Sequence, residues 1–315
     1  MQKNKETYQK FLHRVEREIM SHRIIHDNRY TRWFREGNFT LEDLRRFAVQ
    51  FSVFSNLFIL AQLRKTFNAS TLEEMRESKE ILMNELGVVF KKTIHDVISH
   101  RTSEMVLAKA PDERGPRRTV PYVEGLVRRA TKDNGISDVL FQDADYAADP
   151  LLVSPEGTVQ GGLFRFEAAH FEWLLNFIKP LGLEFNDVGK RKQAIPSTLR
   201  FTDGLERIYG SDDFSEGAGA SFAIEHWAAA GFWKELTQGL KKFREKSKLK
   251  LNLGFWTFHD RLEEQHAVHT EEELQKVYFY ENFNEDKFIQ GGREMLDDCA
   301  VFWDGLDEER LKRNR

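Results

Sequence analysis

The sequence lacks several features that would set its compartment or interrupt its helices. Cys299 is the only cysteine among 315 residues, so no internal disulfide can form, and a reducing, cytoplasmic compartment is expected. The N-terminus has no apolar signal core and no run of about 18 apolar residues occurs, so we expect no membrane segment. Only 7 prolines are present, which favours long uninterrupted helices.

The sequence also has no strong excess of positive or negative charge. The 47 Lys and Arg side chains nearly match the 51 Asp and Glu side chains, for a net charge of −4. Neither nucleic acid nor a membrane surface is therefore an expected partner. What the sequence has in quantity is aromatic residues, with 26 Phe and 6 Trp, which predicts a core or pocket rich in flat, bulky side chains.

Apolar residues recur at helical spacing through most of the chain, so we predict an all-α fold. Thr40–Asp43 and Ser70–Glu73 read as capping boxes, Gly87 reads as a helix stop, and Asn284 reads as the N-cap of the last helix. No strand pair with a hairpin signal occurs in the helical regions. The predicted helices cover about 3–25, 41–65, 71–86, 163–179, 199–209, 216–240, 254–268 and 285–304.

The helical period fails between about 101 and 163, where most of the turn-forming residues gather. So long an irregular stretch inside a domain is usually an insertion or a lid. We therefore predict a single helical domain over 1–315 that carries an insertion at about 97–162.

The segment Phe258–His269 contains three side chains of metal-ligand type on one helix face. His259, Glu263 and His266 are spaced i, i+4, i+7, which places them at roughly 0°, 40° and −20° around a helix. A metal ion is a partner that all three could share in an apolar setting. A solvated polar face is the other interpretation of the same pattern.

Other polar residues stand on predicted apolar helix faces. His170 lies in the middle of the predicted helix 163–179, and Glu225 is the only acid inside the small-residue segment GAGASFAIEHWAAAGF. An unpaired buried carboxylate is costly, so Glu225 needs a cation or a donor nearby. Glu85 occupies the last turn of its helix, where a carboxylate opposes the helix dipole and a local cation would relieve it.

Inward Glu and His side chains of a helix bundle are a common way to hold two iron ions. Three carboxylates would lower the charge of two divalent ions from +4 to about +1, and mixed imidazole and carboxylate ligands with open positions suit non-haem iron and O2. No cysteine ligand is available, which disfavours a structural zinc site. The structural alternative is a polar core network of the same residues.

The order of these pieces resembles the haem-oxygenase-like diiron oxidases, a family of iron-containing redox enzymes. The resemblance lies in WFREGNFTLEDLRRFAVQF (33–51), NELG (84–87), HFEWLLNFIKPLGL (170–183), AIEHWAAAGFW (223–233) and HDRLEEQH (259–266). It implies a helical bundle of about seven core helices and the metal ligands Glu85, His170, Glu225, His259, Glu263 and His266.

The sequence departs from the family's pattern at two places. Glu263 stands where many members have Asp, and the stretch between Glu85 and His170 is longer than is usual. Glu167 is therefore the alternative to Glu85, because Glu167 and His170 form an i, i+3 pair of the kind other diiron bundles use.

The resemblance further implies two Fe2+ ions that activate O2 and oxidise a small amine- or carboxylate-bearing substrate. The outcome would be N-oxygenation, desaturation, or C–C or C–N cleavage, and no catalytic residue beyond the metal ligands is implied. An electron donor and a homodimer stay open as partners. Two other interpretations remain: a cofactorless oxidase of the same fold, and a non-catalytic binding module.

Overall fold

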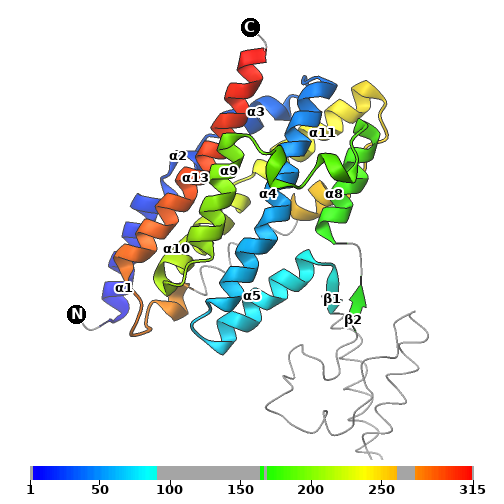
Figure 1. Ribbon diagram of the computed structural model, residues 1–315. Coiled ribbons are helices and arrows are strands. Elements are labelled where there is room, and N and C mark those ends of the chain that lie inside the picture. Colours follow the sequence, from blue (N-terminus) through cyan, green and yellow to red (C-terminus); the bar gives the residue numbers. More distant parts are fainter. Residues whose placement is uncertain (1–2, 91–163, 167–168, 261–273, 314–315) are drawn as a thin grey trace, which may run out of the picture. The chain divides into compact units, whose positions relative to one another are not determined.

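A computed structural model describes residues 3–90, 164–166, 169–260 and 274–313 (Figure 1). The regular secondary structure of the described residues is helical except for one pair of three-residue strands, which agrees with the predicted all-α class. The first half contains α1 (Lys5–Val15), the π-helix η1 (Glu16–Met20), α2 (Arg23–His26), α3 (Arg29–Arg35), α4 (Leu41–Phe67), α5 (Leu72–Glu85) and β1 (Val88–Phe90).

The second half begins with β2 (Phe164–Phe166), which pairs antiparallel with β1 so that Val88 lies opposite Phe166. The helices that follow are α8 (His170–Ile178), η5 (Lys179–Leu181), η6 (Phe185–Asp187), η7 (Arg191–Gln193), α9 (Pro196–Gly204), the π-helix η8 (Leu205–Tyr209), α10 (Phe214–Ala229), α11 (Phe232–Ser247), residues 254–260 and α13 (Glu285–Arg313).

The chain divides into two compact units. One comprises Met1–Glu85 and Ala169–Arg315 and contains every helix named above, and the other comprises Leu86–Ala168 and contains the two strands. The predicted insertion at 97–162 lies outside the described residues, so its bounds stay a prediction.

Several helix ends fall where the sequence places them. Thr40 caps α4, since its side chain accepts a hydrogen bond from the backbone N–H of Asp43 while the Asp43 carboxylate accepts from the N–H of Thr40. Gly87 has a positive φ of 77° directly after α5, as a helix stop requires. Asn284 accepts hydrogen bonds from the backbone of Asp286 and Lys287 at the start of α13.

Three predicted boundaries are wrong. The helix expected over 163–179 begins at His170, because Phe164–Phe166 pairs with β1 and the Glu172 carboxylate accepts from the N–H of Ala169 to start α8. The helix expected over 216–240 is two helices, since Gly231 adopts a φ of 98° between them. The capping residue of α5 is Thr71 rather than Ser70, because Thr71 accepts from the N–H of Glu74.

The N-cap of α10 also differs from the expected Ser215. The Asp213 carboxylate accepts hydrogen bonds from the N–H groups of Ser215 and Glu216, both at 3.1 Å. The Ser215 hydroxyl instead accepts from the N–H of Asn284, which ties the start of α10 to the segment before α13.

Aromatic side chains fill the core, as the composition predicts. Phe47 and Phe51 on α4 are fully buried and both pack against Trp256, with ring centroids 5.5 and 4.9 Å apart. Phe54 and Phe58 continue the same stripe and are partly buried against the core. Core packing therefore explains the α4 Phe stripe.

α4 is the one described helix long and apolar enough to cross a membrane by length and composition, with a mean hydropathy of 1.2 in its most apolar window. Half of that window is buried inside the protein. The core helix of a soluble protein passes the same test, so this feature is weak evidence for a membrane segment.

α10 and α13 lie side by side along their lengths (Figure 1) and approach through glycines. A Cβ atom added at Gly219 would meet the backbone oxygen of Phe288 at 2.0 Å, and one added at Gly291 would meet that of Glu216 at 2.2 Å. The small residues that the sequence gathers in α10 therefore permit a close backbone contact.

We predict that Gly219→Ala destabilises the protein by about 1–3 kcal/mol, because the neighbouring backbone cannot yield without separating the two helices. Gly217 on the same helix is the matched control. An added Cβ there would lie 3.6 Å from its nearest neighbour, so Gly217→Ala should raise the unfolding free energy by up to about 1 kcal/mol through helix propensity. Urea unfolding measures both, and equal effects would contradict the close-contact explanation.

Candidate metal centre

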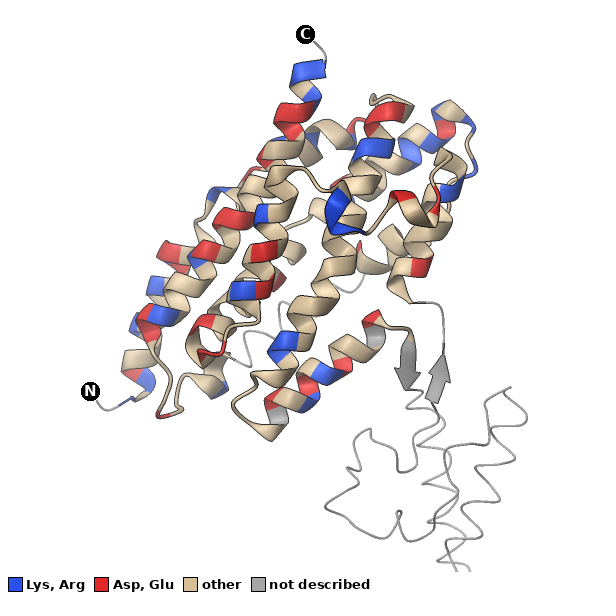
Figure 2. Cartoon of the chain, viewed as in Figure 1, with Lys and Arg blue, Asp and Glu red and all other residues tan. Residues whose placement is uncertain are grey.

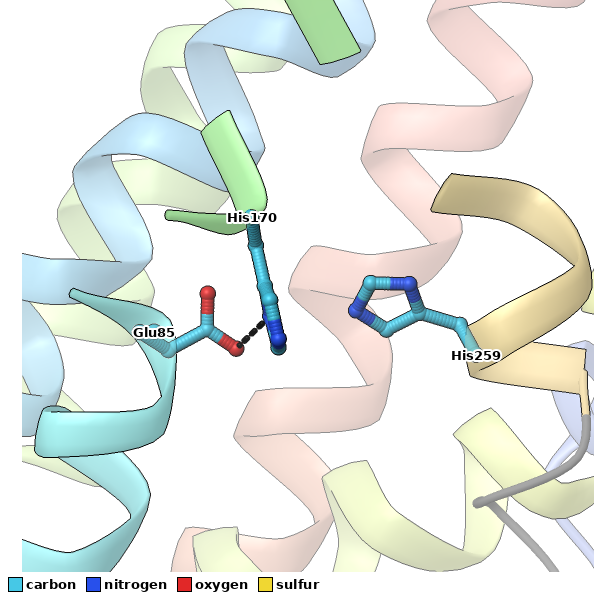
Figure 3. Close-up of side chains that lie close together, drawn as sticks. All are labelled: Glu85, His170 and His259. Atoms are coloured by element: carbon cyan, nitrogen blue, oxygen red, sulfur yellow. Dashed lines mark ion pairs between the residues drawn. The ribbon is translucent and has the colours of Figure 1, made fainter. Parts of the chain in front are cut away.

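Glu85, His170 and His259 meet at one point of the helical unit (Figure 3). Glu85 is the last residue of α5, His170 is the first residue of α8, and His259 lies in the helical segment 254–260. Each offers one ligand atom, and the three atoms all lie within 4.8 Å of one another. Among the described residues, this is the group of His, Cys, Asp and Glu side chains that could hold a metal ion.

The contact between His170 and Glu85 is short but is not a hydrogen bond. Nδ1 of His170 lies 3.0 Å from Oε1 of Glu85, and the two side chains are 10% and 15% exposed. The ring nitrogen is nevertheless buried without a hydrogen-bond partner, so the carboxylate oxygen does not lie where the ring could donate to it. A buried polar nitrogen left in this way is costly unless another group binds it.

A hydrogen bond to the backbone orients the His259 ring. Nδ1 of His259 lies 2.7 Å from the carbonyl oxygen of Phe255, one turn earlier in the same helix. A carbonyl can only accept, so Nδ1 carries the hydrogen and Nε2 carries the lone pair. Figure 3 shows a ring nitrogen of His259 pointing toward His170 and Glu85. Metal-binding histidines commonly hold their second ring nitrogen in this way.

Aromatic rings enclose both imidazoles. Trp233 stacks on His259 with centroids 4.6 Å apart and an angle of 16° between the planes, and Phe255 lies 4.4 Å from the same ring. Trp173 and Phe258 lie 5.1 and 5.2 Å from His170. These rings keep the ring nitrogens in a low-dielectric setting where a charged partner binds more strongly than in water.

The other predicted ligands either lie outside this group of three or fall outside the described residues. Glu225 lies half-buried on α10 and is not a member of the group of three, while its neighbour His226 is only 8% exposed and donates from Nδ1 to the carbonyl of Phe222. Glu167, Glu263 and His266 lie outside the described residues.

Trp233 is the site residue that the sequence did not indicate. The expected continuous helix 216–240 would carry Trp233 on the face set by the α10 pattern. Gly231 interrupts that helix and starts α11 in a new direction, so Trp233 reaches His259 instead. The signal that could have found it is the glycine that precedes the Phe232–Trp233 pair.

No protein-family model matches the sequence, and no curated protein resembles it at a level that indicates common descent. The chemistry of the group therefore rests on its geometry.

Two imidazoles and a carboxylate fit a divalent transition metal such as iron or zinc. Two ligands that each lie about 2.1 Å from one ion can be separated by at most about 4.2 Å. The 4.8 Å spread of the group therefore needs only small side-chain movements to close on an ion. Nδ1 of His170 makes no hydrogen bond and lies next to a carboxylate, an arrangement that suits binding of an ion there.

We predict that Co2+ added to the metal-free protein quenches tryptophan fluorescence, because Trp233 is stacked on a ligand of the ion. Trp233→Phe should remove a large part of the quenching while leaving the affinity for Co2+ nearly unchanged, and the rest should come from Trp173 beside His170. Trp303→Phe is the matched control, since Trp303 is buried in the core and contacts neither imidazole. Equal quenching in the two variants would argue against an ion beside His259.

Proposed function

We propose that this protein is a non-haem diiron oxidase of the haem-oxygenase-like fold. It would use O2 to oxidise a small amine- or carboxylate-bearing substrate in the cytoplasm. The observation that carries the proposal is the convergence of Glu85, His170 and His259, which come from three separate helices, within 4.8 Å. The resemblance in the order of the sequence motifs supports the same proposal.

Glu85, His170 and His259 would hold the first ion. A carboxylate and two imidazoles leave coordination positions for O2 and substrate, a pattern used by non-haem iron enzymes. The choice of Glu85 over Glu167 is supported by the 3.0 Å approach of its carboxylate to His170.

Glu225, Glu263 and His266 would hold the second ion. His259, Glu263 and His266 share one face if the helix at 254–260 continues, so the two ions would be neighbours along that face. The three carboxylates, Glu85 among them, reduce the charge of two divalent ions to about +1.

Iron bound by these residues would supply the electrons that reduce O2. The chain's own residues fix the setting. Nδ1 of His259 donates a hydrogen bond to the carbonyl of Phe255, which keeps the proton on that nitrogen. Nε2 of the same ring would therefore be the ligand atom, and Nδ1 would not supply a proton to the reaction. Trp173, Trp233 and Phe258 pack against the imidazoles and would keep water away from a metal ion bound there.

The test is anaerobic loading with Fe2+, followed by metal analysis and by mixing with O2. The wild-type protein should hold close to two iron ions per chain, as a two-metal bundle requires. Iron should also raise its melting temperature, because the ion binds the folded state alone. His259→Ala should lose at least half of the iron and should consume little O2 in a single turnover.

His13→Ala is the control, because His13 is exposed on α1 and lies outside the site. It should bind iron like the wild type. Iron well below one ion per chain in the wild type, or unchanged loading of His259→Ala, would refute the proposal. O2 consumption that persists in the iron-free protein would support the cofactorless oxidase instead.

A further inference from the structure

A buried hydrogen-bond network joins α4, α5 and η8 at Gln62. The Gln62 side chain is fully buried, and its Nε2 donates to both the carbonyl oxygen and the hydroxyl oxygen of Ser78 on α5, each at 2.8 Å. The phenol of Tyr209 on η8 donates to Oε1 of Gln62 at 2.6 Å. Thr66 completes the network, with its hydroxyl 2.8 Å from that of Ser78.

The network fixes the orientation of the amide without ambiguity. The Ser78 carbonyl can only accept a hydrogen bond, so the atom facing it must be the NH2 group of Gln62. The Gln62 oxygen then faces the phenol of Tyr209, which donates to it. Because hydrogen bonds are directional, a side chain bonded to two different helices restricts how those helices can slide or rotate more strongly than apolar contact does.

α5 packs along α4 but contributes few buried side chains to that contact. Among its described side chains, only Ser78 and Leu82 are buried, and Figure 2 shows that charged residues occupy much of its surface. Apolar contact with a single fully buried side chain specifies the register of α5 on α4 only weakly. The bonds from Gln62 to Ser78 add a directional restraint on that register.

Glu85 depends on this restraint. Ser78, Leu82 and Glu85 are spaced i, i+4, i+7, so they share one face of α5, and Glu85 lies about 10 Å beyond Ser78 along the axis. A shift of one residue in register would rotate that face by about 100° and move the carboxylate away from His170. The 3.0 Å approach of Glu85 to His170 therefore requires α5 to be held in its present register.

We propose that Gln62 is a positioning residue for the metal centre: it holds α5, through Ser78, in the register that presents Glu85 to His170. This inference rests on the proposed metal-binding function. Gln62 itself touches neither His170 nor His259, and it acts only through the helix that carries Glu85.

The experiment compares Gln62→Met with Gln50→Met, each of which keeps most of the side-chain volume. Gln50 also lies on α4, is 7% exposed, and makes two hydrogen bonds, to the carbonyl of Gln193 and from the N–H of Ile195. Both variants should lose similar stability in urea. Gln62→Met should bind Fe2+ or Co2+ about tenfold more weakly than wild type, as loss of a supporting residue usually does, whereas Gln50→Met should bind within about twofold of wild type.

A double variant separates positioning from general damage. In a Glu85→Ala background, Gln62→Met should have no further effect on metal affinity, because the residue through which it acts is absent. An equal loss of affinity in Gln50→Met and Gln62→Met, or an undiminished effect of Gln62→Met in the Glu85→Ala background, would overturn the proposal.

Amide hydrogen exchange of the metal-free protein provides a readout that does not depend on metal. Gln62→Met should speed exchange severalfold across 79–85, and Gln50→Met should leave that segment as in the wild type. If the wild type binds no metal, the proposed function fails. Unchanged exchange of α5 in Gln62→Met would refute the restraint itself.

Discussion

The arrangement of this protein depends on the need to satisfy buried backbone polar groups next to α4. Polar side chains of α4 and of its C-cap residue Asn68 bind the neighbouring segments. Ser52 accepts from the N–H of Gly189, Asn56 donates to the carbonyl of Gly189, and Asn68 donates to the carbonyl of Gly210. Gln50 and Gln62 do the same for the 193–195 segment and for α5. Each buried group must find a partner, so these bonds permit few alternative placements of the elements around α4.

The candidate metal centre uses positions where helices begin and end. Glu85 closes α5 and His170 opens α8, so the ends of these helices, and not their middles, define the site. A carboxylate at a helix C-terminus is unfavourable without a cation, and a buried imidazole nitrogen is unfavourable without a partner. A metal ion would remove both costs at once, so the positions of these two residues suit metal ligands.

Local signals predicted the parts of the fold that local physics controls. The Thr40–Asp43 capping box, the Gly87 stop and the Asn284 cap depend on contacts within about four residues, and each occurs as predicted. One prediction failed because a contact between distant segments prevailed, since Phe164–Phe166 pairs with β1 rather than extending α8. Another failed because a local signal was outweighed, since apolar periodicity continues across Gly231, whose positive φ separates two helices. Trp233 was overlooked for the same reason, since its direction follows from that break.

The sequence by itself determined the helical class, the aromatic core and the residue types that can bind a metal, because periodicity and side-chain chemistry are properties of short segments. Only the tertiary structure decided that Glu85, His170 and His259 converge, that His259 carries its hydrogen on Nδ1, and that Gln62 is bonded to α5. These facts depend on distances between segments far apart in the chain. Such distances follow from how side chains pack and pair across helices, which no pattern within one helix encodes.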